Sequence, residues 1–87
     1  MEVATLQQLT VDDSIMQAHV ESRDVIEFVY PSSKGGGPVR RTLSPWELQG
    51  RSVIGWDHGR EAVRRYIIER IEGGTAVVLD AEYVDPA

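Results

Sequence analysis

The first periodic pattern along the chain is that of an amphipathic helix near the N-terminus. Its apolar or partly apolar positions recur at helical spacing: Val11, Ile15, Met16, His19 and Val20. The hydroxyl of Thr10 can cap the start of such a helix, and Asp13 three residues later completes a pattern close to a capping box. We therefore predict a helix over about residues 10–23 with one apolar face.

The rest of the chain consists of short segments rich in β-branched and aromatic residues, separated by turns of glycine, proline and polar residues. These segments predict five strands: residues 24–30, 39–43, 51–57, 63–71 and 75–83. The second is expected to end at Ser44-Pro45, because proline cannot donate to a strand ladder. Charges in residues 63–71 also suit a helix, but the β-branched content of this segment favours a strand.

A helix followed by five short strands predicts a mainly β fold, a small antiparallel five-stranded barrel with an N-terminal helix. The length of 87 residues allows one domain, residues 1–87, with the barrel over about 24–84. The absence of cysteine excludes disulfide frameworks and thiolate metal sites. Because no run of about 18 apolar residues and no signal-peptide pattern occurs, we expect a soluble cytoplasmic protein with no membrane partner.

The net charge of -5 at first argues against nucleic acid as a partner. Residues 34–70, however, hold eight basic and four acidic side chains, a net charge of +4, and the remainder holds one basic and ten acidic, a net charge of -9. Most of the basic side chains are arginines, which bind phosphates and carboxylates through a planar fork. A basic middle is therefore compatible with an anionic ligand, although a solvated charged face would have the same pattern.

No arrangement of residues points to catalysis. His19 lies on the apolar face of the predicted helix, and His58 follows Asp57 in a turn without a nucleophile nearby. No histidine and carboxylate spacing suggests a metal site, and no helix start follows the glycines at 35–37 to make a phosphate loop. We expect a protein that is not an enzyme and that uses no metal or cofactor.

The segment 63–71 carries the strongest candidate for a binding surface. In a strand with period two, one face would present Arg64, Tyr66, Ile68 and Arg70. Two guanidinium groups around an aromatic ring can hold a phosphate and stack a base. The alternative is that Tyr66 and Ile68 belong to the core, with the arginines paired to Asp57, Glu61 or Asp80.

Three stretches of the chain together resemble the WYL domain family. They read VIEFVY at 25–30, RRTLSPWEL at 40–48 and VIGWDHGREAVRRYIIERI at 53–71. Pro45 and Leu48 match a P-x-x-L motif of the family. A second motif, R-x-F-x-x-x-R-I, is matched by Arg64, Tyr66, Arg70 and Ile71, with tyrosine in place of phenylalanine. The tripeptide that names the family is replaced by Arg51-Ser52-Val53, which leaves a smaller and more polar surface.

This resemblance implies an Sm-like or SH3-like barrel and a ligand-sensing module of transcriptional or defence regulation, mostly bacterial, either standalone or excised from a larger regulator. It also implies a ligand such as single-stranded nucleic acid or a nucleotide. Arg64 and Arg70 would bind phosphate, Tyr30 and Tyr66 would line the groove, and Arg40 or Arg41 would extend it. The alternative is a protein-interaction or oligomerisation module that acts through its strand edges, with a second copy or another protein as partner.

Overall fold

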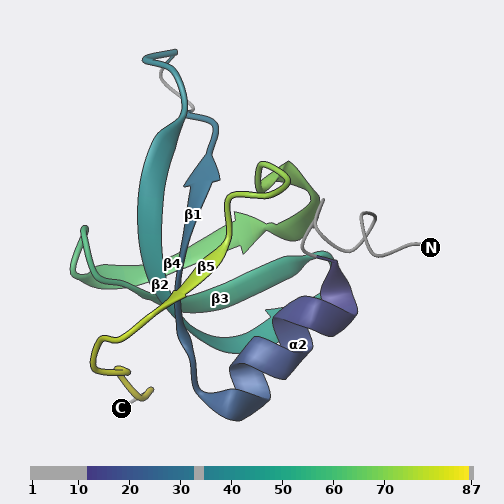
Figure 1. Cartoon of the computed structure of the whole chain (residues 1–87), viewed down its shortest axis with the longest axis vertical. Helices are drawn as coiled ribbons and strands as arrows, with labels where there is room; N and C mark the ends of the chain where they lie inside the picture. Colours follow the sequence, from purple (N-terminus) through teal and green to yellow (C-terminus); the bar gives the residue numbers. More distant parts are fainter. Residues whose placement is uncertain (1–11, 33–34, 87) are drawn as a thin grey trace.

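The computed structural model describes residues 12–32 and 35–86, which form one helix and one antiparallel sheet (Figure 1). The elements in chain order are α2 (Asp13–Ser22), β1 (Val25–Tyr30), β2 (Val39–Gln49), β3 (Ser52–Asp57), β4 (Ala62–Ile67), the 3-10 turn η1 (Ile68–Arg70) and β5 (Val77–Leu79). The sheet order is β4-β3-β2-β1-β5. The predicted mainly β fold with five antiparallel strands and an N-terminal helix is confirmed.

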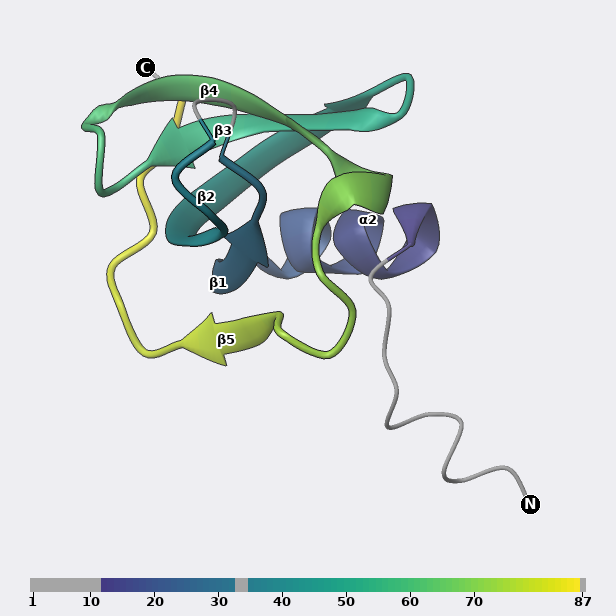
Figure 2. The same cartoon turned by 90° about the horizontal axis from the view of Figure 1, so that it is seen from above.

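The predicted closure into a barrel is wrong. β4 and β5 lie at the two ends of the strand order and do not pair with each other. Figure 2 shows them on opposite sides of the molecule, with β1 and β2 between them. β5 has only three residues, where residues 75–83 were expected to form a strand, and such a short strand offers little backbone for a closing ladder.

Helix α2 begins one residue after Asp12, whose side chain accepts a hydrogen bond of 2.9 Å from the backbone N–H of Ile15. This bond satisfies one of the unpaired donors of the first turn and lowers the pKa of the Asp12 carboxyl. The proposed cap Thr10 lies outside the described residues. The helix ends at Ser22 and is capped by Arg23, which adopts a left-handed conformation with φ of 58°. Met16 is the helix residue that is fully buried against the sheet.

Strand β2 continues through Ser44-Pro45, where the sequence pattern predicted its end. It pairs with β1 up to Leu43 and with β3 from Leu43 onward, and its register shifts between Pro45 and Glu47. The proline therefore lies where the ladder to β1 has stopped and beside a bulge, which is a position at which a strand tolerates proline.

Strand β4 is shorter than the predicted strand over residues 63–71. It ends at Ile67, and the chain then turns through η1, so that Ile68 and Ile71 both enter the core. The backbone N–H of Ile68 donates to the carbonyl of Arg51 at 2.9 Å, which fixes the turn against the start of β3. The period-two alternation therefore stops before Arg70.

The core lies between α2, η1 and one face of the sheet. Its buried residues are Met16, Ile26, Phe28, Leu43, Val53, Tyr66, Ile68 and Ile71. Phe28, Tyr30 and Tyr66 meet edge to face, and the ring centres of the two tyrosines are 4.8 Å apart. Edge-to-face aromatic pairs add to the stabilisation by area burial alone. The core thus places two tyrosines side by side at the end of β1 and in β4.

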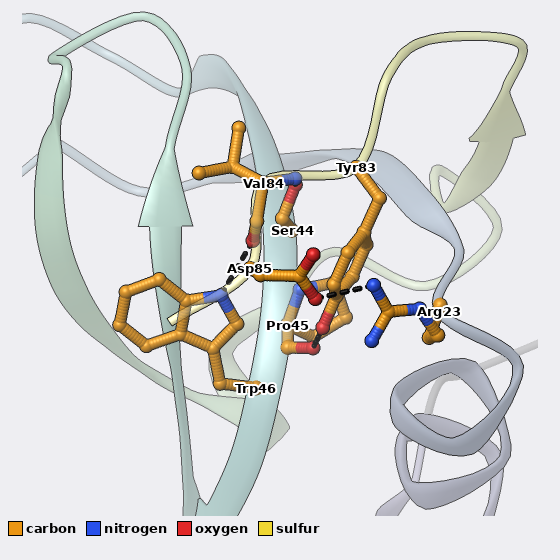
Figure 3. Close-up of polar contacts among 7 residues, drawn as sticks. All are labelled: Arg23, Ser44, Pro45, Trp46, Tyr83, Val84 and Asp85. Atoms are coloured by element: carbon orange, nitrogen blue, oxygen red, sulfur yellow. Dashed lines mark hydrogen bonds and ion pairs between the residues drawn. The ribbon is translucent and has the colours of Figure 1, made fainter. Parts of the chain in front are cut away.

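After β5 the chain crosses to β2 and is held there by side chains (Figure 3). The indole N–H of Trp46 donates to the carbonyl of Val84 at 2.7 Å, and the N–H of Val84 donates to the Ser44 hydroxyl at 3.0 Å. The Tyr83 hydroxyl donates to the carbonyl of Pro45 at 2.6 Å. Arg23 pairs with Asp85 and lies over the ring of Tyr83. These bonds occupy the side of β2 that β1 leaves open.

Replacing Ser44 by alanine should lower the free energy of unfolding by about 1–2 kcal/mol, because two partly buried groups each lose a hydrogen-bond partner. Its fully buried hydroxyl is bonded to Val84 N–H and, at 2.7 Å, to Nε2 of His58. Denaturant unfolding measures the difference. Ser22→Ala on the exposed side of α2 is the control and should change stability by less than about 0.5 kcal/mol. Equal effects of the two changes would contradict the role given to Ser44.

Candidate functional site

A pocket of about 580 Å³ opens between the β1–β2 loop, the β3–β4 turn and β4. Its walls are formed by Tyr30, Pro31, Ser32, Val39, Arg41, Arg60, Arg64 and Tyr66. Tyr30 and Val39 are paired neighbours at the ends of β1 and β2, and Arg41 follows Val39 on the same face of its strand. Alternation in β4 likewise brings Arg64 and Tyr66 to one face.

The pocket carries positive charge without a matching carboxylate. Three arginines line it, and none of the described residues in its wall is acidic. Within the part of the chain that the structure describes, three of the five other arginines are paired, Arg23 with Asp85, Arg40 with Glu27 and Arg51 with Glu69, whereas Arg65 and Arg70 form no ion pair. No such ion pair forms there at Arg41, Arg60 or Arg64. Nε of Arg41 is buried and has no hydrogen-bond partner.

The two tyrosines of the pocket differ in what their hydroxyls bind. The Tyr66 hydroxyl donates to Oδ2 of Asp57. Burial of the Tyr66 side chain raises the pKa of its phenol above the ordinary value, and the bond to Asp57 raises it further. The Tyr30 hydroxyl accepts the backbone N–H of Ile67 at 2.9 Å, so its own hydrogen remains available to another acceptor. Tyr66 is 7% exposed whereas Tyr30 is partly exposed, so Tyr30 offers more ring surface to a ligand.

The position of Arg60 depends on Asp57 at the end of β3. Oδ1 of this fully buried carboxylate accepts the backbone N–H groups of Gly59 at 2.9 Å and of Arg60 at 3.0 Å. The N–H of Glu61 closes the turn on the carbonyl of Asp57 at 2.7 Å. These bonds hold the β3–β4 turn in a shape that brings Arg60 to the pocket.

The structure brings together four of the six residues predicted to bind a ligand: Tyr30, Arg41, Arg64 and Tyr66. Arg70 does not line the pocket, because the chain leaves the strand at Ile67 and η1 turns Arg70 away from the face of Arg64. Neighbouring residues of a strand point to opposite faces, so Arg40 is separated from Arg41 and binds Glu27 at 3.2 Å.

The sequence patterns did not indicate four further wall residues: Arg60, Val39, Pro31 and Ser32. The turn around Asp57-His58-Gly59-Arg60 held a usable signal, because an aspartate followed by glycine two residues later is typical of a turn in which the carboxylate binds backbone N–H groups. The alternative interpretation of the segment is correct in one part, since Tyr66 and Ile68 are core residues. In the described part of the chain its proposed ion pairs with Asp57, Glu61 or Asp80 do not form.

Two further features bear on the kind of site. His58 is bonded to Ser44, as described above, and lies outside the pocket wall. In residues 12–32 and 35–86, no group of three metal-ligating side chains comes together. Among these residues, no helix combines the length and the apolar character needed to cross a membrane.

Comparison with known proteins relates the chain to one family. The family model of the WYL domain matches residues 13–76, which include the helix, β1 to β4 and all wall residues of the pocket. No curated protein and no solved structure matches the chain. WYL domains are regulatory rather than catalytic. Because the match covers well over half of the sequence, the chain belongs to the WYL domain family.

Proposed function

We propose that this WYL domain is a regulatory binding module whose pocket takes the phosphate of single-stranded nucleic acid or of a nucleotide. The observation that carries the proposal is Arg41, whose buried Nε has no hydrogen-bond partner and which lines the pocket together with Arg60 and Arg64. A buried donor without a partner costs about 1–3 kcal/mol, and more when it is charged. A bound phosphate would give the Arg41 guanidinium group an acceptor and offset the repulsion among the three guanidinium groups.

The aromatic side chains support the same ligand class. Tyr30 lies beside Arg41 and Arg64 in the pocket wall and is only partly buried, so its ring can stack on a base whose phosphate the arginines hold. Tyr66 packs on Tyr30 from the core and keeps that ring in place. We therefore assign phosphate binding to Arg41, Arg60 and Arg64 and base stacking to Tyr30.

Substituting one pocket arginine should weaken binding of a fluorescein-labelled ten-nucleotide thymidine strand about tenfold, because a charge-assisted hydrogen bond is lost. The variants are Arg41→Gln and Arg64→Gln, measured by fluorescence anisotropy in low salt. Arg40→Gln and Arg70→Gln are matched controls on arginines outside the pocket and should stay within about twofold of the unsubstituted protein.

Two results would contradict this proposal. One is the absence of binding by the unsubstituted protein, to the strand or to a mononucleotide, even at low salt. The other is an equal loss of affinity in the control variants, which would mean that the general charge of the surface binds the strand. A similar loss with strands of other base sequence is expected, since phosphate contacts carry no sequence information.

Assembly through the strand edges remains a second candidate because the sheet is open. β4 and β5 are edge strands, and they carry the exposed side chains Val63, Val77 and Val78. An unpaired edge can add a strand from a second copy of the chain. Light scattering that gives the mass of a stable dimer or ring would favour this candidate, and a monomer at all accessible concentrations would exclude it.

A further inference from the structure

Asp57 is a buried carboxylate directly behind the pocket wall, and it does not itself line the pocket. Its two oxygens have different partners. Oδ1 accepts the N–H groups of Gly59 and Arg60, and Oδ2 accepts the hydroxyl of Tyr66. One carboxylate therefore touches the backbone of one wall residue and the side chain of another.

The bond to Tyr66 decides what this tyrosine can offer a ligand. A phenol has one hydrogen, and the hydrogen of Tyr66 is donated inward to Asp57. Tyr66 lines the pocket, so a ligand there meets a phenol whose hydrogen is already engaged. An oxygen without an available hydrogen cannot donate to an anion, so donors to an anion must come from other wall residues, such as the guanidinium groups and the Tyr30 hydroxyl.

The charge of Asp57 also acts on the pocket. Arg41 and Arg60 both lower the pKa of Tyr66 while the Asp57 charge raises it, so both guanidinium groups lie within electrostatic range of the hydroxyl that Asp57 binds. Because Asp57 and Tyr66 are buried and Arg41 is partly buried, water screens the Asp57 charge only in part, and this charge offsets some of the positive potential of the arginines. Asp57 also repels each negative charge of a bound anion, so its unfavourable effect on binding grows with the charge of the ligand.

We propose that Asp57 is a specificity-determining residue of the pocket, which limits its affinity for highly charged anions by drawing the Tyr66 hydrogen inward and by offsetting part of the arginine charge. The inference rests on the proposed function, in which the pocket holds an anion. It gives Asp57 a role distinct from stabilising the turn, because the two roles predict opposite effects of one substitution on affinity.

Asp57→Asn separates the two roles. The asparagine oxygen can still accept the N–H groups of Gly59 and Arg60, while its amide group, now a donor, faces the Tyr66 oxygen. The Tyr66 hydrogen is then released toward the pocket, and one negative charge is removed. Calorimetric titration should show pyrophosphate binding about three- to tenfold tighter than in the unsubstituted protein, with a smaller gain for inorganic phosphate, although the variant is less stable.

A purely structural Asp57 would lower stability and affinity together, so equal or weaker pyrophosphate binding by folded Asp57→Asn overturns the inference and leaves the proposed function intact. If the unsubstituted protein binds neither pyrophosphate nor the oligonucleotide, the proposed function and this inference are both wrong. If Asp57→Asn does not fold, Tyr66→Phe is the second test of the inference. Its pyrophosphate affinity should stay within about twofold, because the Tyr66 hydrogen is donated to Asp57 and not to the ligand, and a tenfold loss would overturn the inference.

Discussion

Gly55→Ala is expected to destabilise the protein by about 3 kcal/mol or more, a large share of the roughly 4–13 kcal/mol typical of a domain of this size. Gly55 lies in β3 opposite Pro45 of β2. An added Cβ would stand 2.8 Å from Cα of Pro45 and closer still to the carbonyl oxygen of Ser44. Both are backbone atoms of the neighbouring strand, so the methyl group fits only if the two strands move apart beside the bulge.

Chemical denaturation monitored by tryptophan fluorescence measures this loss. Gly36→Ala is the matched control, because an added Cβ there has no atom within 4 Å and the backbone does not need positive φ. It should leave stability unchanged or raise it slightly, since alanine restricts the unfolded chain. A Gly55→Ala protein as stable as the control would contradict the close pairing of β2 and β3.

Removing all three pocket arginines should have the largest effect on binding. In the triple variant Arg41→Gln, Arg60→Gln, Arg64→Gln, we expect the oligonucleotide affinity to fall at least about 100-fold. The slope of log affinity against log salt should shrink by about 2, because three phosphate contacts to a single strand contribute about 0.7 each. Fluorescence anisotropy over a series of salt concentrations gives both values.

The same triple variant should be as stable as the unsubstituted protein or more stable. The three guanidinium groups repel one another and have no carboxylate partner in the described residues, so their removal relieves repulsion without breaking an ion pair. Loss of binding together with loss of folded structure would contradict this prediction, because it would show that the arginines stabilise the fold.

Local patterns in the sequence were sufficient to predict most of the fold. Alternation and β-branched residues located β1 and β3 to within one residue, since these short strands have one clearly apolar face. β2 was predicted too short because the tolerance for Pro45 depends on where the ladder to β1 stops, which is a tertiary property. Barrel closure was wrong because Tyr83 and Val84 bind side chains and a carbonyl of β2 instead of extending β5.

Strand alternation and the family resemblance together predicted part of the candidate site. Strand alternation correctly joined Arg64 to Tyr66, and the family resemblance added Tyr30 and Arg41. Arg70 was predicted on the wrong face because the backbone changes from strand to 3-10 turn after Ile67. No glycine, proline or other turn residue in this segment indicates that change. Arg60 was missed because its direction is set by hydrogen bonds from its turn to Asp57, and such bonds become visible only in three dimensions.

The most direct test of the central claim, that the arginine pocket holds an anion, is NMR of the arginine Nε–H groups during titration with the ten-nucleotide strand. We expect the Arg41 Nε–H signal, from a buried donor without a partner, to move most and to become more protected from exchange. Signals of Arg60 and Arg64 should move with it while those of Arg40 and Arg70 stay in place. Shifts confined to Arg40 and Arg70, with an unchanged Arg41 signal, would contradict anion binding by the pocket.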